Sequence, residues 1–232
     1  MKMKTAVCIS GQCRTLNKTY ASIQKNVLDP LGDYDLFMYV AKDAYSRYAL
    51  LLQPTVIEAV NDQYIDEGDL VNWENCRLKT GVQPYLQQLY ALNRCNLLRR
   101  SYEKQRRIRY DCVIRCRPDI LFLEPIGNID RLDLNYIYLP DFHHFDGCND
   151  RFAIGNSENM NIYFNKFDCF CEYVHDFLKK NGVPLSAEMF TILHLQQNNI
   201  ETRTLPVRFN RMRAHGITDD LKKTHRKVKK VT

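Results

Sequence analysis

The sequence predicts an α/β domain with a mixed, mostly parallel central sheet flanked by helices. Three observations support this fold class. Short apolar, β-branched segments alternate with segments of helical periodicity along the 232 residues. Hydrophobic residues make up 45% of the chain and charged residues 26%, which is ordinary for a globular protein. A chain of this length also fits one domain and can bury a core without disulfides.

One domain accounts for residues 1–218, and a basic tail is expected over residues 219–232. Six cations of this tail equal the whole formal net charge of +6, so the rest of the chain is close to neutral. They are Lys222, Lys223, Arg226, Lys227, Lys229 and Lys230. The tail is either a solvated, frayed end or a contact for anionic lipid or nucleic acid.

The amino-terminal part is predicted to run strand, helix, strand, strand. Residues 5–9 are apolar and β-branched, which is typical of a fully buried strand, and a Ser-Gly pair ends them. Residues 17–28 have helical character, and an Asp-Pro-Leu-Gly-Asp segment ends that helix. Apolar segments at 34–40 and 54–60 then predict two further strands.

From residue 83 the pattern becomes helical. Leucines recur along one stripe over residues 86–98, and a cationic run over 99–109 ends the helix, where cations suit the helix dipole. Further strands are predicted at 111–116, 120–123, 136–139 and 152–155.

Two more helices and a last strand are predicted towards the carboxyl terminus. Apolar residues over 160–177 recur at spacings of three and four, which predicts one long amphipathic helix ended by an Asn-Gly pair. Ser186 suits the N-cap position of the next helix, with Glu188 in its first turn. Residues 200–207 predict the final strand.

Several classes of protein are excluded. There is no apolar run of about 18 residues and no signal-peptide pattern, so we expect a cytoplasmic protein. The nine cysteines form no CxxC pair, and several lie inside apolar strands or helices, which indicates core residues in a reducing compartment. The P-loop, dinucleotide-binding, nucleophile-elbow and HExxH motifs are all absent.

Polar residues follow the predicted strands, at the edge where open α/β sheets bind ligands. The first strand ends in Ser10 and Gly11, with Arg14 close behind; glycine permits close approach and arginine offers a forked donor to phosphate. The second strand ends near Asp43, which is either a turn former or a contact to a ribose or base.

The apolar strand at 111–116 ends in the segment Arg115-Cys116-Arg117-Pro118-Asp119, which holds two cations and a carboxylate. Buried charges are costly unless they are paired or bind a ligand. The segment is therefore either a structural Arg–Asp pair or a site for a diphosphate and a metal ion. Mg²⁺ and Mn²⁺ prefer carboxylate oxygen and share their shell with phosphates, which suits Asp119, whereas Arg117 suits phosphate.

Three further segments are candidates for a site. The loop at 146–151, which includes Asp150, is either an ordinary turn or a contact for sugar or acceptor hydroxyls. Glu188 either favours the N-terminus of its helix or acts as a general base for an attacking hydroxyl. His215 is either a surface histidine or a ligand to metal or phosphate.

The order of these segments resembles a known family. The segments that carry the resemblance are AVCISGQCRT (6–15), YDLF (34–37), YDCVIRCRPDI (110–120), DRFAIG (150–155) and SAEM (186–189). Together they resemble the small GT-A-type glycosyltransferases of large algal DNA viruses and their microbial and algal relatives, over roughly residues 5–215. These look like stand-alone sugar transferases that decorate capsid or surface glycans.

The resemblance implies a GT-A-like, Rossmann-like domain over residues 1–218. It would transfer a sugar from a nucleotide-diphosphate donor, UDP- or GDP-linked, to a glycan hydroxyl, such as one on a viral capsid or surface glycan. The donor contacts implied are Ser10, Gly11, Arg14, Asp43, Arg117 and Arg213. In an inverting enzyme the acceptor's base matches Glu188 best and Asp150 second; in a retaining enzyme neither has that role.

The resemblance also implies a divalent metal, Mn²⁺ or Mg²⁺, at the position of the family's Asp-x-Asp motif. This chain has Arg-Pro-Asp there, with one carboxylate. Either Asp119 holds the ion together with phosphates and His215, or Arg117 replaces part of the metal's charge.

Two other functions stay open. A sugar-phosphate nucleotidyltransferase needs a glycine- and lysine-rich loop after the first strand, which residues 10–16 match poorly. A non-catalytic nucleotide- or glycan-binding module would contact membrane or nucleic acid through the basic tail. For the enzyme, the expected partners are a nucleotide-sugar donor, a glycan or glycoprotein acceptor and a weak membrane-surface contact, with no specific nucleic acid.

Overall fold

The computed structural model describes residues 3–62, 64–65, 81–145, 147–181 and 186–218. The predicted basic tail, residues 219–232, lies outside the described residues, so its contacts and the boundary at 218 stay predictions. Within the described part, seven strands form one sheet in the order β3-β2-β1-β4-β7-β6-β8. Three more strands form a small second sheet in the order β10-β9-β5.

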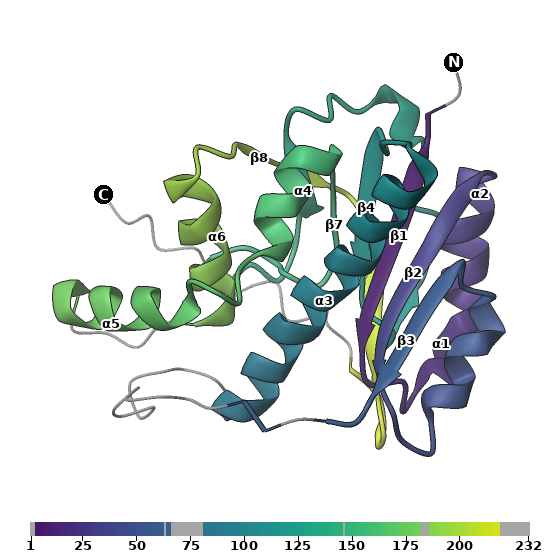
Figure 1. The fold of residues 1–232 in the computed structure, drawn as a ribbon, viewed down its shortest axis with the longest axis horizontal. Helices are drawn as coiled ribbons and strands as arrows, with labels where there is room; N and C mark the ends of the chain where they lie inside the picture. The colour runs from purple at the N-terminus through teal and green to yellow at the C-terminus, as the bar shows by residue number, and fades with distance from the viewer. Residues whose placement is uncertain (1–2, 63, 66–80, 146, 182–185, 219–232) are drawn as a thin grey trace.

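Strands and helices alternate along the chain, as the sequence predicts (Figure 1). The strands are β1 (Thr5–Gly11), β2 (Tyr34–Ala41), β3 (Val56–Val60), β4 (Cys112–Cys116), β5 (Ile120–Phe122), β6 (Ile137–Pro140), β7 (Ala153–Gly155), β8 (Thr202–Leu205), β9 (Phe209–Arg213) and β10 (Gly216–Thr218). The α-helices are α1 (Leu16–Ile23), α2 (Asp29–Leu31), α3 (Val82–Arg106), α4 (Ser157–Phe164), α5 (Phe170–Asn181) and α6 (Ala187–Gln197). Gln24–Leu28 forms a π-helical turn, and Ser46–Leu52 and Ile129–Arg131 are 3₁₀ helices.

Most neighbouring strands of the large sheet are parallel. β1 pairs in parallel with β2 and β4, β2 with β3, and β6 with β8, whereas β7 is antiparallel to both β4 and β6. The residues of β1 are buried up to Ser10 because both faces of the sheet are covered. The predicted α/β fold with a mixed, mostly parallel sheet flanked by helices is confirmed.

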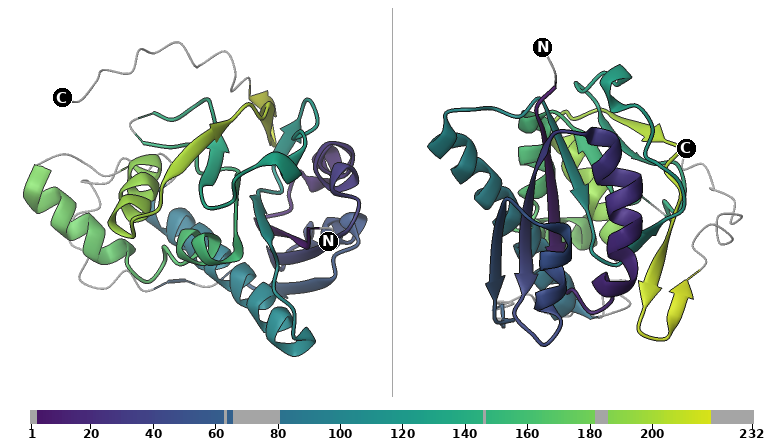
Figure 2. Two further views of the ribbon diagram at one scale, coloured as in Figure 1. Left: turned by 90° about the horizontal axis from the view of Figure 1, so that it is seen from above. Right: turned by 90° about the vertical axis from the view of Figure 1, so that its right-hand side faces the viewer.

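Helices cover both faces of the sheet (Figure 2). On one face α1 contributes Leu16 to a core cluster with Val7 of β1. On the other face α3 and α4 pack on the sheet, and Leu92 of α3 meets Cys8 of β1. A smaller cluster joins the first turns of α3 to α5 and α6. No helix in the described part of the chain is long and apolar enough to cross a membrane.

The prediction of one long helix over 160–177 is wrong. α4 ends at Phe164 and α5 begins at Phe170, and the residues between them turn. In that turn Lys166 is buried and its Nζ donates to Thr191 Oγ1 of α6 at 3.0 Å. Phe167 still packs on the cluster of α5 and α6. The apolar spacing therefore continues across the break and does not reveal it.

The predicted final strand, 200–207, is shorter than expected, and two strands follow it that the sequence did not predict. β8 covers Thr202–Leu205, and β9 and β10 form an antiparallel sheet with β5. β9 reads Phe-Asn-Arg-Met-Arg, which lacks a regular apolar alternation. Pairing with β5 places Arg211 opposite Ile120, so the arginines of β9 lie near the end of β4.

Candidate functional site

The candidate site lies at the carboxyl edge of β1 and β4. β1 pairs with β2 on one side and β4 on the other, so the strand order reverses there, and open α/β sheets bind ligands outside such a point. Because β7 is antiparallel to β4, the residues just before β7 reach the same edge. This edge lies at the bottom of Figure 1, near the turn between β9 and β10.

Arg117 and Asp119 form a forked ion pair at the end of β4. Arg117 Nε donates to Asp119 Oδ1 at 2.8 Å, and Nη2 donates to Oδ2 at 2.9 Å. Arg213 of β9 also approaches Asp119, with Nη1 3.2 Å from Oδ2. The backbone carbonyl of Asp119 accepts from Met212 N at 2.8 Å. Arg117 thus engages both oxygens of this carboxylate, and Arg213 shares Oδ2 with it.

The pKa of Asp119 reflects this pairing. Burial alone would raise the pKa, but Arg117, and then Arg213 and Arg211, outweigh burial and lower it to about 2. Burial would lower the pKa of Arg117, but Asp119 more than offsets that effect, and the pKa of Arg117 is raised. Both groups are therefore charged at neutral pH.

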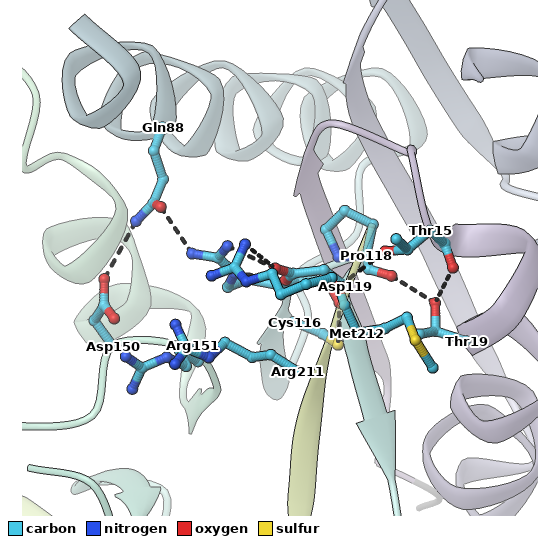
Figure 3. A network of polar contacts seen from close by, with 12 residues as sticks. Thr15, Thr19, Gln88, Cys116, Pro118, Asp119, Asp150, Arg151, Arg211 and Met212 are labelled. Carbon is cyan, nitrogen blue, oxygen red and sulfur yellow. Dashed lines mark hydrogen bonds and ion pairs between the residues drawn. The ribbon is translucent and has the colours of Figure 1, made fainter. Parts of the chain in front are cut away.

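Gln88 of α3 links the arginine of this pair to a second carboxylate, Asp150 (Figure 3). Its Oε1 accepts from Arg117 Nη1 at 2.8 Å, and its Nε2 donates to Asp150 Oδ2 at 3.2 Å. Asp150 is buried, and its backbone carbonyl accepts from Tyr163 Oη at 3.0 Å. A neutral amide therefore fixes the relative positions of a cation and a carboxylate.

The second pair joins the start of β7 to the first turn of α6. Arg151 Nη2 lies 3.3 Å from Glu188 Oε1, and Arg151 Nη1 donates to Asn149 Oδ1 at 3.3 Å. Ser186 caps α6, as predicted: its Oγ accepts from Met189 N at 3.1 Å. Figure 3 shows Arg211 reaching from β9 towards Arg151. Two guanidinium groups therefore converge beside the Glu188 helix end.

The two carboxylates of this second group have opposite pKa shifts. Burial and the nearby Asp150 raise the pKa of Glu188, against the opposing effect of Arg151. Burial would also raise the pKa of Asp150, but Arg115, Arg151 and the other surrounding cations reverse this, so its pKa is lowered. Glu188 is therefore the better proton acceptor near neutral pH.

Two more cations are buried behind the edge. Arg115 of β4 is 2% exposed, and its Nε and Nη1 find no hydrogen-bond partner among the described residues. Burial lowers the pKa of Lys166 to about 8, with Arg115 adding to the shift and Asp150 opposing it. Buried charges of one sign are costly without an opposite charge.

The charges of the described cluster do not balance. Its cations are Arg115, Arg117, Arg151, Lys166, Arg211 and Arg213, and its carboxylates are Asp119, Asp150 and Glu188. Six positive charges face three negative ones. The arrangement therefore favours an anionic ligand with several negative charges.

The other residues predicted to contact the donor lie on or near this edge. Ser10 is buried at the end of β1, and Gly11 has a φ of +121°, with the Pro118 ring 3.9 Å from where a Cβ would stand. Arg14 is exposed. Asp43 is exposed after β2, and its Oδ1 accepts from Tyr45 N at 2.8 Å, which is a turn contact. None of these facts tests a role in donor binding.

The residues present do not fit a divalent metal ion. The carboxylate oxygens of Asp119 already accept from Arg117 and face Arg213. His215 is exposed between β9 and β10. Within the described ranges, no group of three or more His, Cys, Asp or Glu side chains could hold a metal ion. The predicted metal role of Asp119 and His215 gains no support from this set of donors and stays a prediction.

The structure brings five of the residues that the sequence singled out, Arg117, Asp119, Arg213, Asp150 and Glu188, to one edge of the sheet, and their functional roles stay predictions. Sequence reasoning assigned no site role to Gln88, Arg115, Lys166 or Arg211. Only Arg115 carried a signal, because it is a charge inside the apolar strand Cys112–Cys116. Gln88 and Lys166 lie in helical patterns where a polar residue is ordinary.

Comparisons with known proteins place the chain in a family. Residues 1–209 match the family described as "Domain of unknown function (DUF7796)". The chain belongs to this family. No curated protein sequence matches this DUF7796 member.

Solved structures similar to this DUF7796 chain include two of the glycosyltransferase GlyE from Streptococcus pneumoniae TIGR4, one of them the apo form. Each is 13% identical, with TM-scores of 0.40 and 0.41 for the two structures. The match covers 88% of this chain and 45% of GlyE, so the chain spans under half the length of that protein.

Proposed function

We propose that the protein is a glycosyltransferase that binds a nucleotide-diphosphate sugar at the carboxyl edge of β1 and β4. The observation that carries this proposal is the excess of three positive charges in the buried cluster there. A diphosphate is an anion of matching charge, and the switch point of an open sheet is where such ligands bind. The resemblance to GT-A-type enzymes in the segments that end β1 and β4 agrees with this proposal.

In the proposed reaction, the bond between the sugar's anomeric carbon and the diphosphate oxygen breaks, and the electron pair leaves with the diphosphate. A new bond forms from the acceptor hydroxyl oxygen to the same carbon. Arg117 and Arg213 stabilise the charge that develops on the leaving diphosphate, because Asp119 already fixes the positions of both guanidinium groups. UDP and GDP are the proposed nucleotides.

The acceptor's proton goes to Glu188 in this proposal. Its raised pKa makes it a better base than Asp150, whose pKa is lowered. Arg151, 3.3 Å from Glu188 Oε1, orients the carboxylate. Asp150 then serves as a positioning residue that holds Gln88, and through it Arg117. The proposed acceptor is a glycan hydroxyl, such as one on a capsid or surface glycan.

The test is turnover of a panel of UDP- and GDP-sugars, followed as release of the free nucleotide, with the transferred sugar identified by mass spectrometry. Glu188→Gln should lower kcat by about 10²- to 10⁴-fold while donor binding persists. Glu158→Gln is the matched control, because Glu158 also lies in the first turn of a helix and faces an arginine, Arg109, at 3.2 Å. Donor binding without turnover by the unchanged protein would favour the non-catalytic binding module.

A further inference from the structure

The carboxylates of the cluster are engaged by the protein's own donors. Asp119 is held by Arg117 and Arg213, Glu188 by Arg151, and Asp150 by Gln88. A divalent ion bound to Asp119 or to Glu188 would stand within a few ångströms of a guanidinium group. At such distances the repulsion between like charges is strong, and burial strengthens it.

We infer that the guanidinium groups of Arg117, Arg211 and Arg213 hold the donor's diphosphate in place of a divalent metal ion. Asp119 is then a positioning residue for two of these arginines. This inference rests on the proposed function and names how that same site recognises its donor. It replaces the metal implied by the resemblance with side chains of this chain.

The accessibility of the arginines suits this role. Arg117 and Arg213 have side chains that are 20% and 33% exposed, so a ligand can reach them. Arg115 and Lys166 are buried behind them and keep the local charge positive. Guanidinium groups donate in pairs to phosphate oxygens, which lets fixed side chains both orient and neutralise a diphosphate.

The two possible ligands, a divalent cation and a nucleoside diphosphate, change the net charge of the cluster in opposite directions. A divalent cation would raise the excess from three positive charges to five, whereas a nucleoside diphosphate with up to three negative charges would cancel it. Arg115 Nε and Nη1, which find no partner among the described residues, lie in this positive potential, which a nearby anion would reduce. The described residues therefore favour phosphate over metal.

The experiment is calorimetric titration of the full chain with UDP and with GDP, once in excess EDTA and once in Mn²⁺. We expect the preferred nucleotide to bind in EDTA with a Kd within about threefold of its Kd in Mn²⁺. Arg213→Gln should weaken binding in EDTA by about tenfold or more, since a charge-assisted contact is lost. Spin-resonance titration should show no Mn²⁺ bound to the nucleotide-free protein.

Arg208→Gln is the matched control. Arg208 pairs with Asp141 and its side chain is 34% exposed, against 33% for Arg213, but it precedes the opposite end of β9. Arg208 is therefore about 16 Å from Arg213 along the strand direction. Nucleotide binding should be unchanged in this variant. Thermal melts of both variants establish that the fold is kept.

The outcomes distinguish the inference from the proposed function. Nucleotide binding that requires Mn²⁺ overturns the inference and leaves the glycosyltransferase standing. Binding in EDTA that Arg213→Gln and Arg117→Gln both leave unchanged also overturns it, because the diphosphate then lies elsewhere. No binding of UDP or GDP under either condition removes the donor site itself, and with it the proposed function.

Discussion

Asp119 shows how one carboxylate can organise a cationic site. Its side chain is nearly buried, and on its own it would be protonated more easily than in water. Arg117 and Arg213 reverse that tendency, and the carbonyl of Asp119 is tied to Met212 of β9. The residue thus fastens β9 to the end of β4 and holds two guanidinium groups at the edge of the sheet.

This arrangement predicts an acid-sensitive contribution to stability. The pKa of Asp119 is about 2 in the folded protein and 3.8 as an ordinary value, so the unfolded state binds more protons between these pH values. Its contribution is therefore complete above pH 3.8 and is lost as the pH falls towards 2. A shift of this size corresponds to about 2 kcal/mol.

Asp119→Asn should remove that part of the pH dependence. The measurement is the free energy of unfolding by urea between pH 2 and 4 for both proteins. The unchanged protein should lose more stability across this window than the variant, by about 2 kcal/mol. Equal slopes for the two proteins would show that Asp119 is not ionised by the pairing described above.

At the scale of elements, the strands were easier to predict from the sequence than the side chains that meet at their ends. The buried strands β1, β2 and β4 show as apolar, β-branched runs, and their ends mark the edge where the site lies. The hairpin of β9 and β10 was not predictable in this way. Its strands are short and lack a regular apolar alternation, and β9 gains its place from pairing with β5, which is a tertiary effect.

The same limit applies to the site. Arg117 and Asp119 are two residues apart, so their pairing was one of two open interpretations of the sequence. Gln88 and Asp150 are 62 residues apart, and only packing of α3 over the sheet brings the amide to the carboxylate. Periodicity describes which face of an element is buried but carries no information on which polar side chains meet across elements.

The loop before β7 approaches the first turn of α6 so closely that only glycine fits at position 147. A Cβ on Gly147 would stand 2.1 Å from the carbonyl oxygen of Glu188, which is backbone and cannot rotate away. The next residue, Cys148, donates its backbone N–H to that same oxygen at 3.1 Å. The position of Glu188 therefore depends on this contact between a loop and a helix end.

Gly147→Ala should lower stability by about 1–3 kcal/mol and also lower turnover, because the displaced element carries Glu188. Gly127→Ala is the comparison: Gly127 has a φ of +82° and open space around it, and it lines a hollow with Thr5 at the opposite end of β1. That variant should lose about 1 kcal/mol through backbone strain and keep its kcat. The measurements are urea unfolding and nucleotide release; a Gly147→Ala protein with full turnover would contradict the role of this contact.

Across the whole molecule, positive charge is concentrated in two places of different character. One is the cluster at the carboxyl edge of the sheet, where cations are buried or half-buried and held by specific partners. The other is the run of Lys and Arg residues over 222–230 in the sequence. Contacts of solvated charges are screened by salt within about 8–10 Å, whereas buried pairs are screened much less. For a solvated tail, one of the two interpretations of the sequence, the two sources of charge would therefore differ in their response to ionic strength.

This difference separates the enzyme from a binding module that acts through its tail. Replacing the six cations over 222–230 by glutamine should leave the Kd for the preferred nucleotide within about twofold, because the proposed diphosphate site is the cluster at the sheet edge. The same change should abolish any binding to phosphatidylserine vesicles, which salt should also weaken steeply in the unchanged protein. The measurements are calorimetric titration for the nucleotide and co-sedimentation for the vesicles. A loss of nucleotide binding in the glutamine variant would show that the tail, and not the sheet edge, binds the anion. No group at the sheet edge is altered in that protein.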